Sequence, residues 1–66
     1  MNENQEIART QVNEYIYQMN ENRKISLEDI QQHFVTDKNV QQYLFDYFED
    51  VVMEVEIYNS GIKDVI

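Results

Sequence analysis

A cluster of carboxylates in the second half of the chain is the feature best able to do chemistry. Its members are Asp46, Glu49, Asp50, Glu54 and Glu56. The first three fall one helical turn apart, and the last two share one face if an extended strand follows the helix. Carboxylates at such spacings can imitate a run of phosphates and occupy a basic groove on another protein. The alternative is a solvated face, because net charge keeps small domains soluble.

Catalytic and metal-binding sites are not expected. A catalytic histidine needs an orienting acid and a nucleophile, and no serine or cysteine stands in a context that would serve His33. Neighbouring carboxylates such as Glu49 and Asp50 point in different directions from a helix, so the pair cannot clamp one ion. Calcium-loop spacing and glycine-rich phosphate loops are also missing from the sequence. We therefore expect a protein that is not an enzyme and that needs neither a cofactor nor a metal.

The composition describes one small, acidic domain over residues 1–66. The chain has 13 Asp and Glu against 5 Lys and Arg, which gives a formal net charge of -8. This charge opposes nucleic acid and anionic membranes and favours a partner with a basic protein surface. A domain this short buries only ~60% of its unfolded surface. We therefore expect added stability from a homodimer or from a complex with a partner.

Two helices are predicted in the first half of the chain. The first spans residues 4–20, because Ala8, Val12, Ile16 and Met19 recur at helical spacing. Residues 1–5 are polar and are expected to be frayed. Asparagines at residues 20 and 22 tolerate the left-handed conformation that ends helices, and residues 23–25 form a short extended link. Ser26 then begins a second helix over residues 27–34, with a capping box completed by Asp29.

A third helix and a β-hairpin are predicted in the second half. The helix begins at Thr36 or Asp37, and its apolar stripe contains Val40, Leu44, Tyr47, Phe48 and Val51. From Val52 the apolar period changes to two. Met53, Val55 and Ile57 alternate with Glu54, Glu56 and Tyr58, which predicts a half-exposed strand. Residues 59–61 form a turn in which Gly61 supplies a positive φ, and residues 62–65 return as a second strand. The expected fold class is mainly α with a small C-terminal β-hairpin.

Two aromatic residues lie beside the stripe of the third helix. Phe45 is rotated by 140° from Val40, at 100° per residue, and so should point away from the core. Tyr43 lies at the edge of the stripe. We expect the two side chains to contribute to a partner or dimer contact next to the carboxylates.

The predicted order of elements resembles the winged helix-turn-helix family over residues 7–65. The residues that carry the resemblance are Ser26, Leu27, Ile30, Phe34, Val35, Thr36, Val40, Leu44 and Tyr47, with Val51 and Val52 before the wing. The resemblance implies three helices plus a wing. The sequence departs from the family at Gln31, where a small residue is usual, and at Glu49 and Asp50, where a glycine commonly precedes the wing.

The resemblance also implies an alternative function in binding DNA. In DNA-binding relatives the third helix enters the major groove, and the matching outward residues here are Lys38, Asn39, Gln41 and Gln42. A dimeric regulator would use them to contact base edges and phosphate. The acidic residues around them repel phosphate, so nucleic acid is the less favoured partner.

Our main expectation is a small protein-interaction module with an acidic surface. Short acidic proteins of this kind are often inhibitors from phages or mobile elements that bind a host protein, in some cases one that itself binds nucleic acid; this step is an analogy. The sequence has no apolar run near the ~20 residues that span a bilayer. No positively charged start is followed by an apolar segment, so we expect no signal peptide. We expect a cytoplasmic protein without membrane contact, placed in the host cytoplasm if a phage encodes it.

Overall fold

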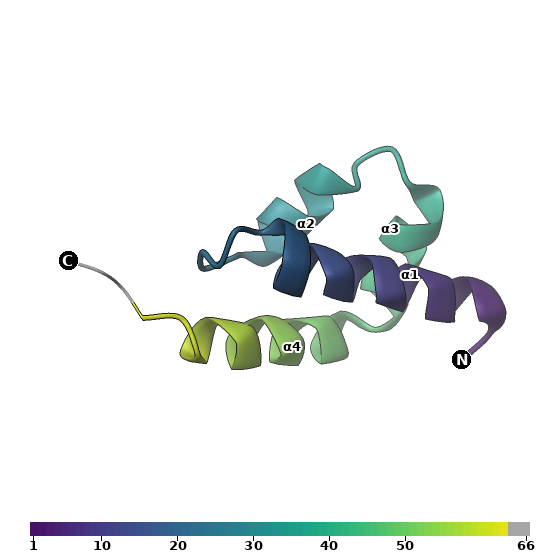
Figure 1. The fold of residues 1–66 in the computed structure, drawn as a ribbon. Coiled ribbons are helices and arrows are strands. Elements are labelled where there is room, and N and C mark those ends of the chain that lie inside the picture. The colour runs from purple at the N-terminus through teal and green to yellow at the C-terminus, as the bar shows by residue number, and fades with distance from the viewer. Residues whose placement is uncertain (64–66) are drawn as a thin grey trace.

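The computed structural model describes residues 1–63, and these form helices without any strand (Figure 1). In chain order the elements are α1 (Glu3–Glu14), a π-helical turn η1 (Tyr15–Met19), α2 (Leu27–His33), α3 (Lys38–Asp46) and α4 (Phe48–Ser60). The predicted hairpin, and with it the wing, is therefore wrong, because the first strand lies inside α4. The second strand, predicted over residues 62–65, is not formed at residues 62 and 63, and residues 64 and 65 lie outside the described part.

Helix α1 begins where Asn2 caps it. The Asn2 side chain accepts a hydrogen bond from the Gln5 amide at 2.9 Å, and the Gln5 side chain accepts one from the Asn2 amide at 3.0 Å. This reciprocal pair satisfies two otherwise unpaired donors, so residues 1–5 contain the cap and the first turn of α1. The predicted stripe is buried except at Met19, which is exposed. The π-helical turn η1 changes the helical register and moves Met19 off the stripe.

Local caps also define the start of α2 and α3. The capping box predicted at Ser26 is confirmed: its hydroxyl accepts from the Asp29 amide at 3.2 Å, and the Asp29 carboxylate accepts from the Ser26 amide at 2.9 Å. At α3 the Asp37 carboxylate accepts from the amides of Asn39 and Val40, each at 3.1 Å. Each cap satisfies amides that the first helical turn leaves unpaired.

Helix α4 replaces the predicted end of the third helix and the first strand. The backbone leaves the helical conformation at Tyr47 (φ -121°, ψ 38°), so the long third helix is divided there. Val51, Val55 and Tyr58 are buried at spacings of four and three residues, which is the helical period. The predicted turn at Gly61 is also wrong, because its φ is -87° and it simply follows the end of α4.

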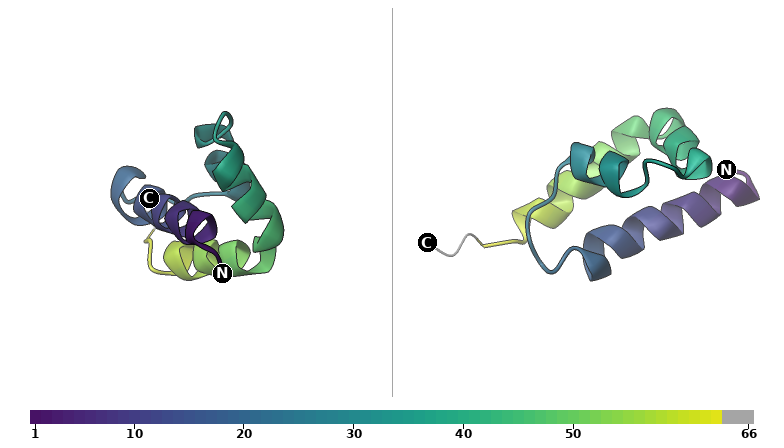
Figure 2. Two further views of the ribbon diagram at one scale, coloured as in Figure 1. Left: turned by 90° about the vertical axis from the view of Figure 1, so that its right-hand side faces the viewer. Right: turned by 90° about the horizontal axis from the view of Figure 1, so that it is seen from above.

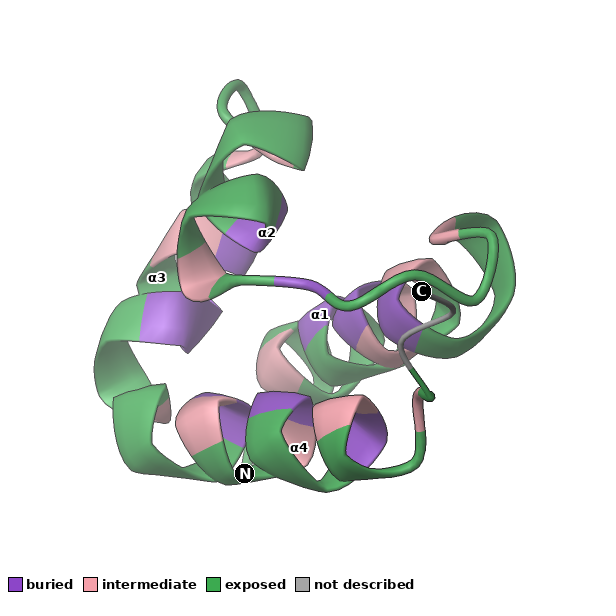
Figure 3. Ribbon diagram, turned by 90° about the vertical axis from the view of Figure 1, so that its left-hand side faces the viewer, coloured by how far each residue is buried: buried purple, intermediate pink, exposed green. Residues whose placement is uncertain are grey.

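The helices enclose one core (Figures 2 and 3). Helices α1 and α4 run in the same general direction, α3 packs on α1, and both α2 and η1 pack on α4. The buried side chains come from every element and from the link before α2: Ala8, Val12, Ile16, Ile25, Ile30, Val40, Tyr43, Leu44, Val51, Val55 and Tyr58. The outward surfaces of α3 and α4 are left to solvent.

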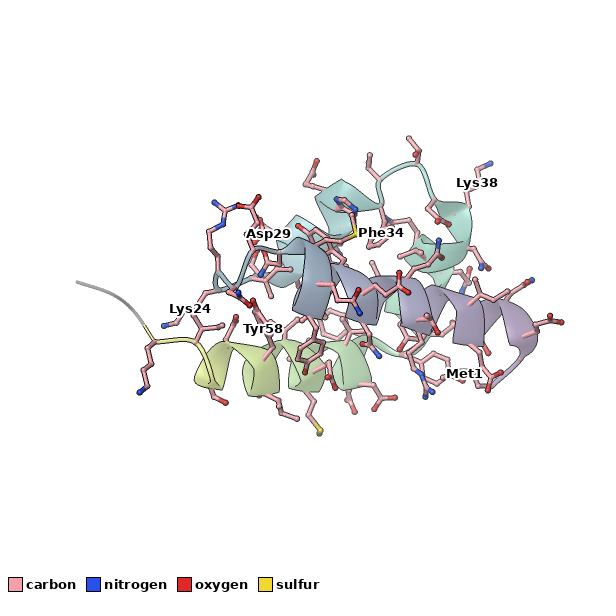
Figure 4. The ribbon with its side chains drawn as sticks, in the orientation of Figure 1. Met1, Lys24, Asp29, Phe34, Lys38 and Tyr58 are labelled. Atoms are coloured by element: carbon pink, nitrogen blue, oxygen red, sulfur yellow. The ribbon has the colours of Figure 1, made fainter. Side chains whose placement is uncertain are left out.

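The link between η1 and α2 is held in place by the end of α4. The amide of Ile25 donates to the Asn59 side-chain oxygen at 2.8 Å, and the Asn59 side-chain nitrogen donates to the Ile25 carbonyl at 2.7 Å. The Tyr58 hydroxyl donates to the Arg23 carbonyl at 2.9 Å beneath the link (Figure 4). The extended link therefore pairs with side chains of a helix and not with a neighbouring strand.

Candidate protein-binding surface

A hollow of about 390 Å³ lies at the corner where α3 ends and α4 begins. We call it the corner hollow; its lining residues are Phe45, Asp46, Tyr47, Phe48, Glu49 and Asp50. Phe45 is 80% exposed, as its rotation from the stripe predicted, and Phe48 is 50% exposed. The corner exists because Tyr47 leaves the helix, and the Tyr47 ring stacks on Tyr43 with centroids 5.3 Å apart. Every charged residue of the lining is acidic.

The solvent side of α4 continues from this corner as a second feature. Met53 and Ile57 are 59% and 56% exposed and lie one turn apart. At 100° per residue, Glu49 and Glu56 lie along one side of this pair and Asp50 lies along the other. We call these five residues the outer α4 face. An apolar stripe with carboxylates along both sides is unlike an ordinary solvent face, on which polar residues occupy the middle.

The predicted carboxylate cluster divides into two groups. Asp46 accepts hydrogen bonds from the Gln5 side chain at 3.2 Å and from the Gln42 side chain at 3.0 Å. Glu54 accepts one from the Tyr17 hydroxyl. Glu49, Asp50 and Glu56 have no hydrogen bond or ion pair to any residue in the described range 1–63. The last group is therefore the one available to a partner.

The spatial arrangement of the cluster also differs from the prediction. Asp46 belongs to α3, whereas Glu49 and Asp50 belong to α4, so the three do not line one helix. Glu54 and Glu56 lie on a helix and not on a strand, so they point to different sides. The hydrogen bond to Glu54 is the main reason why the pKa of Tyr17 is raised, because it stabilises the protonated phenol. Glu54 thus joins α4 to η1.

Tyr43 lies in the core and not in the surface predicted for it. Only 4% of the residue is exposed, and burial is the main cause that raises the pKa of its phenol. It borders a separate hollow of about 340 Å³, which Arg9 of α1 and Asp50 and Glu54 of α4 also line. The nearby positive charge of Arg9 partly offsets this rise in the pKa of Tyr43. Tyr43 is thus not accessible enough to join a docking surface.

Most of the residues predicted to contact DNA have partners within the protein. The Asn39 side chain donates to the Asn4 carbonyl at 2.9 Å. The Gln41 side chain donates to the Phe34 carbonyl at 2.8 Å and closes the turn between α2 and α3. Gln42 donates to Asp46, and Lys38 extends away from the molecule (Figure 4). The Asn39 and Gln41 amides position α3 against α1 and the end of α2, whereas the Gln42 bond lies within α3.

Among residues 1–63, His33 contacts aromatic rings and forms no ion pair with a carboxylate. The His33 ring is exposed and stacks on Tyr15, with centroids 4.1 Å apart. Within residues 1–63, no three His, Cys, Asp or Glu side chains are grouped so that they could hold a metal ion. None of the helices described is both long and apolar enough to cross a membrane.

Comparison of the chain with protein-family models, curated proteins and solved structures gave no match.

Three apolar residues of the surface were not predicted from the sequence. Phe48 was assigned to the buried stripe of the third helix, and Met53 and Ile57 were assigned to the covered face of a strand. The signal that could have found the last two is their spacing of four residues. On a helix whose buried stripe is Val51, Val55 and Tyr58, that spacing places the pair on the opposite side.

Proposed function

We propose that this chain is a protein-binding module that docks on a basic surface of another protein through the outer α4 face. The observation that carries the proposal is the exposure of Met53 and Ile57 between carboxylates that have no partner in residues 1–63. Burial of the apolar pair would favour association, because it removes apolar area from water. The carboxylates would steer a positively charged partner and set its orientation.

We further propose that the partner is a protein that binds nucleic acid, and that the chain inhibits it. Such proteins present Lys and Arg to phosphate, and the same side chains can pair with Glu49, Asp50 and Glu56. Occupation of that surface would exclude the nucleic acid. An origin in a phage or mobile element is part of this proposal by analogy with other short acidic inhibitors.

Other occupants of the surface are less compatible with its charge. Two copies of the chain joined through the outer α4 face would bring unpaired carboxylates of both copies together, and like charges at an interface oppose association. Duplex DNA would meet the same carboxylates. The side-chain amides of Asn39, Gln41 and Gln42, which could contact bases, donate to groups of the protein.

The test compares two triple variants of equal charge. Glu49→Gln, Asp50→Asn and Glu56→Gln together neutralise the outer α4 face. Glu3→Gln, Glu14→Gln and Glu28→Gln form a matched control, because these glutamates are exposed and two of them also lie in the first turn of a helix. A partner is first captured from the native host, identified and purified, and its affinity for each variant is then measured by calorimetry.

We expect the first triple variant to bind the partner at least about tenfold more weakly than the wild type, which corresponds to a loss of about 1.4 kcal/mol of binding free energy. The control should remain within about twofold of the wild type, and wild-type chain should displace nucleic acid from the partner. Equal affinity of all three proteins would contradict the role of the outer α4 face. A partner that binds chain and nucleic acid at the same time would contradict inhibition by occupation.

A further inference from the structure

The corner hollow has a more specific chemistry than the rest of the surface. Its two phenylalanine side chains are 80% and 50% exposed, although burial of such rings is favourable. They belong to different helices, Phe45 to α3 and Phe48 to α4, and they line one hollow with three carboxylates. Apolar walls with anionic groups beside them form an unpartnered surface whose charge selects the occupant.

One carboxylate of the hollow, that of Asp46, is positioned by hydrogen bonds. The two oxygens of Asp46 accept hydrogen bonds from the side chains of Gln5 and Gln42, which come from α1 and α3. Glu49 and Asp50 have no such partner among residues 1–63. The hollow therefore combines a positioned carboxylate with two that can move toward a guest.

An arginine side chain matches these features. Its guanidinium is planar, stacks on aromatic rings and pairs with carboxylates through several donors. A lysine ammonium is more strongly hydrated and offers a point charge without a planar face. A second copy of this chain would bring further acids, and a phosphate would be repelled. Charge complementarity thus favours a basic side chain, and the aromatic walls favour arginine over lysine.

We propose that the corner hollow binds an arginine side chain that projects from a helix of the partner. Apolar residues next to this arginine on the partner helix would lie on Met53 and Ile57. This inference rests on the proposed function, because it specifies what the same surface binds. The Phe45 and Phe48 rings would contact the guanidinium plane. Asp46, Glu49 and Asp50 would accept its hydrogen bonds.

The experiment uses two synthetic helical peptides and the full chain. Both peptides carry one stripe of leucines, with four arginines beside it in one peptide and four lysines in the other. Affinities are measured by calorimetry at low salt, and ¹⁵N chemical-shift changes locate the contact. The variants are Phe45→Ser, Phe45→Tyr and, as a control for loss of an exposed apolar side chain elsewhere, Val35→Ser.

We expect the arginine peptide to bind about fivefold more tightly than the lysine peptide, as a cation–π contact of about 1 kcal/mol would give. The largest shift changes should occur at Phe45, Phe48 and Glu49. Phe45→Ser should remove the preference for arginine, whereas Phe45→Tyr and Val35→Ser should keep it. Because Phe45 is largely exposed, its replacement should leave the helical circular dichroism unchanged.

The outcomes separate this inference from the proposed function. Equal affinity of the two peptides, or a preference that survives Phe45→Ser, would overturn the arginine site. If those peptides still bound more weakly to the Glu49→Gln, Asp50→Asn, Glu56→Gln variant, the proposed function would stand. Failure of both peptides to bind, or binding that this triple variant does not weaken, would overturn both proposals.

Discussion

At the scale of single residues, helical rotation separates neighbours into accessible and inaccessible groups. Phe45 is exposed and Tyr43, two residues earlier, is buried beside Tyr47. The carboxylates divide by their hydrogen bonds, because Asp46 and Glu54 join elements of the fold while Glu49 remains available. Residue type alone did not make either distinction.

Gly61→Ala tests the helical end of α4 against the predicted hairpin turn. The φ of -87° suits alanine, and the added Cβ would lie 3.5 Å from the Tyr58 carbonyl oxygen, which is an ordinary contact. We expect the free energy of unfolding to rise by about 0.5 kcal/mol, because alanine reduces the freedom of the unfolded chain. Urea denaturation would measure this change in the free energy of unfolding. A decrease of about 1 kcal/mol would instead indicate a left-handed residue, as in a turn.

At the scale of elements, the two sides of α4 have different roles. Its inner side supplies Val51, Val55 and Tyr58 to the core, and its last residues fasten the link around Ile25. Its outer side does not pack in the core and carries the candidate surface. The division of α3 from α4 at Tyr47 adds the corner hollow to that surface.

Asn59→Ala tests the attachment of the link to α4. Ile25 is buried, and the change would leave its amide and its carbonyl without their hydrogen-bond partners. We expect the free energy of unfolding to fall by about 2 kcal/mol, as for other buried groups left unpaired. The neighbouring Ser60→Ala is the control, since the Ser60 hydroxyl bonds only within the exposed surface of α4. Equal effects of the two changes would mean that the link does not depend on Asn59.

At the scale of the whole molecule, the charge of -8 opposes the compact state through self-repulsion. Exposed ion pairs relieve little of this repulsion. The pair between Arg23 and Glu21 is of this kind, because their side chains are 75% and 78% exposed. Excess negative charge therefore costs stability, and the basic partner proposed above would relieve this repulsion. A basic partner would stabilise the fold as well as bind it.

Salt should therefore stabilise the isolated protein. Between about 0.01 M and 0.3 M NaCl the Debye length falls from roughly 30 Å to less than 10 Å, so repulsion across the molecule is screened and Tm should rise. The Glu3→Gln, Glu14→Gln, Glu28→Gln variant has three fewer negative charges and should show a smaller rise. Calorimetric melting at several salt concentrations would measure both. A Tm that falls with salt would mean that attractive pairs dominate the electrostatic free energy.

The sequence alone determined those features that depend on contacts a few residues apart. Of the two asparagines expected to tolerate a left-handed conformation, Asn22 adopts it (φ 58°) and Asn20 does not (φ -83°), while Glu21 (φ 56°) adopts it without having been predicted. The cap at Ser26 and the outward direction of Phe45 were predicted and are present. Each is decided by a side chain and backbone groups of the same turn. The helix boundaries in the first half of the chain follow from the same short-range interactions.

Only the tertiary structure decided the conformation of residues 48–60. The alternation of Met53, Val55 and Ile57 fits a strand, and the spacing of Val51, Val55 and Tyr58 fits a helix equally well over so short a segment. Packing against α2, α3 and η1 selects the second set for the core, because the helix buries a continuous apolar stripe. That choice turns Met53 and Ile57 outward among the carboxylates, so the candidate surface is a consequence of long-range packing that local sequence does not specify.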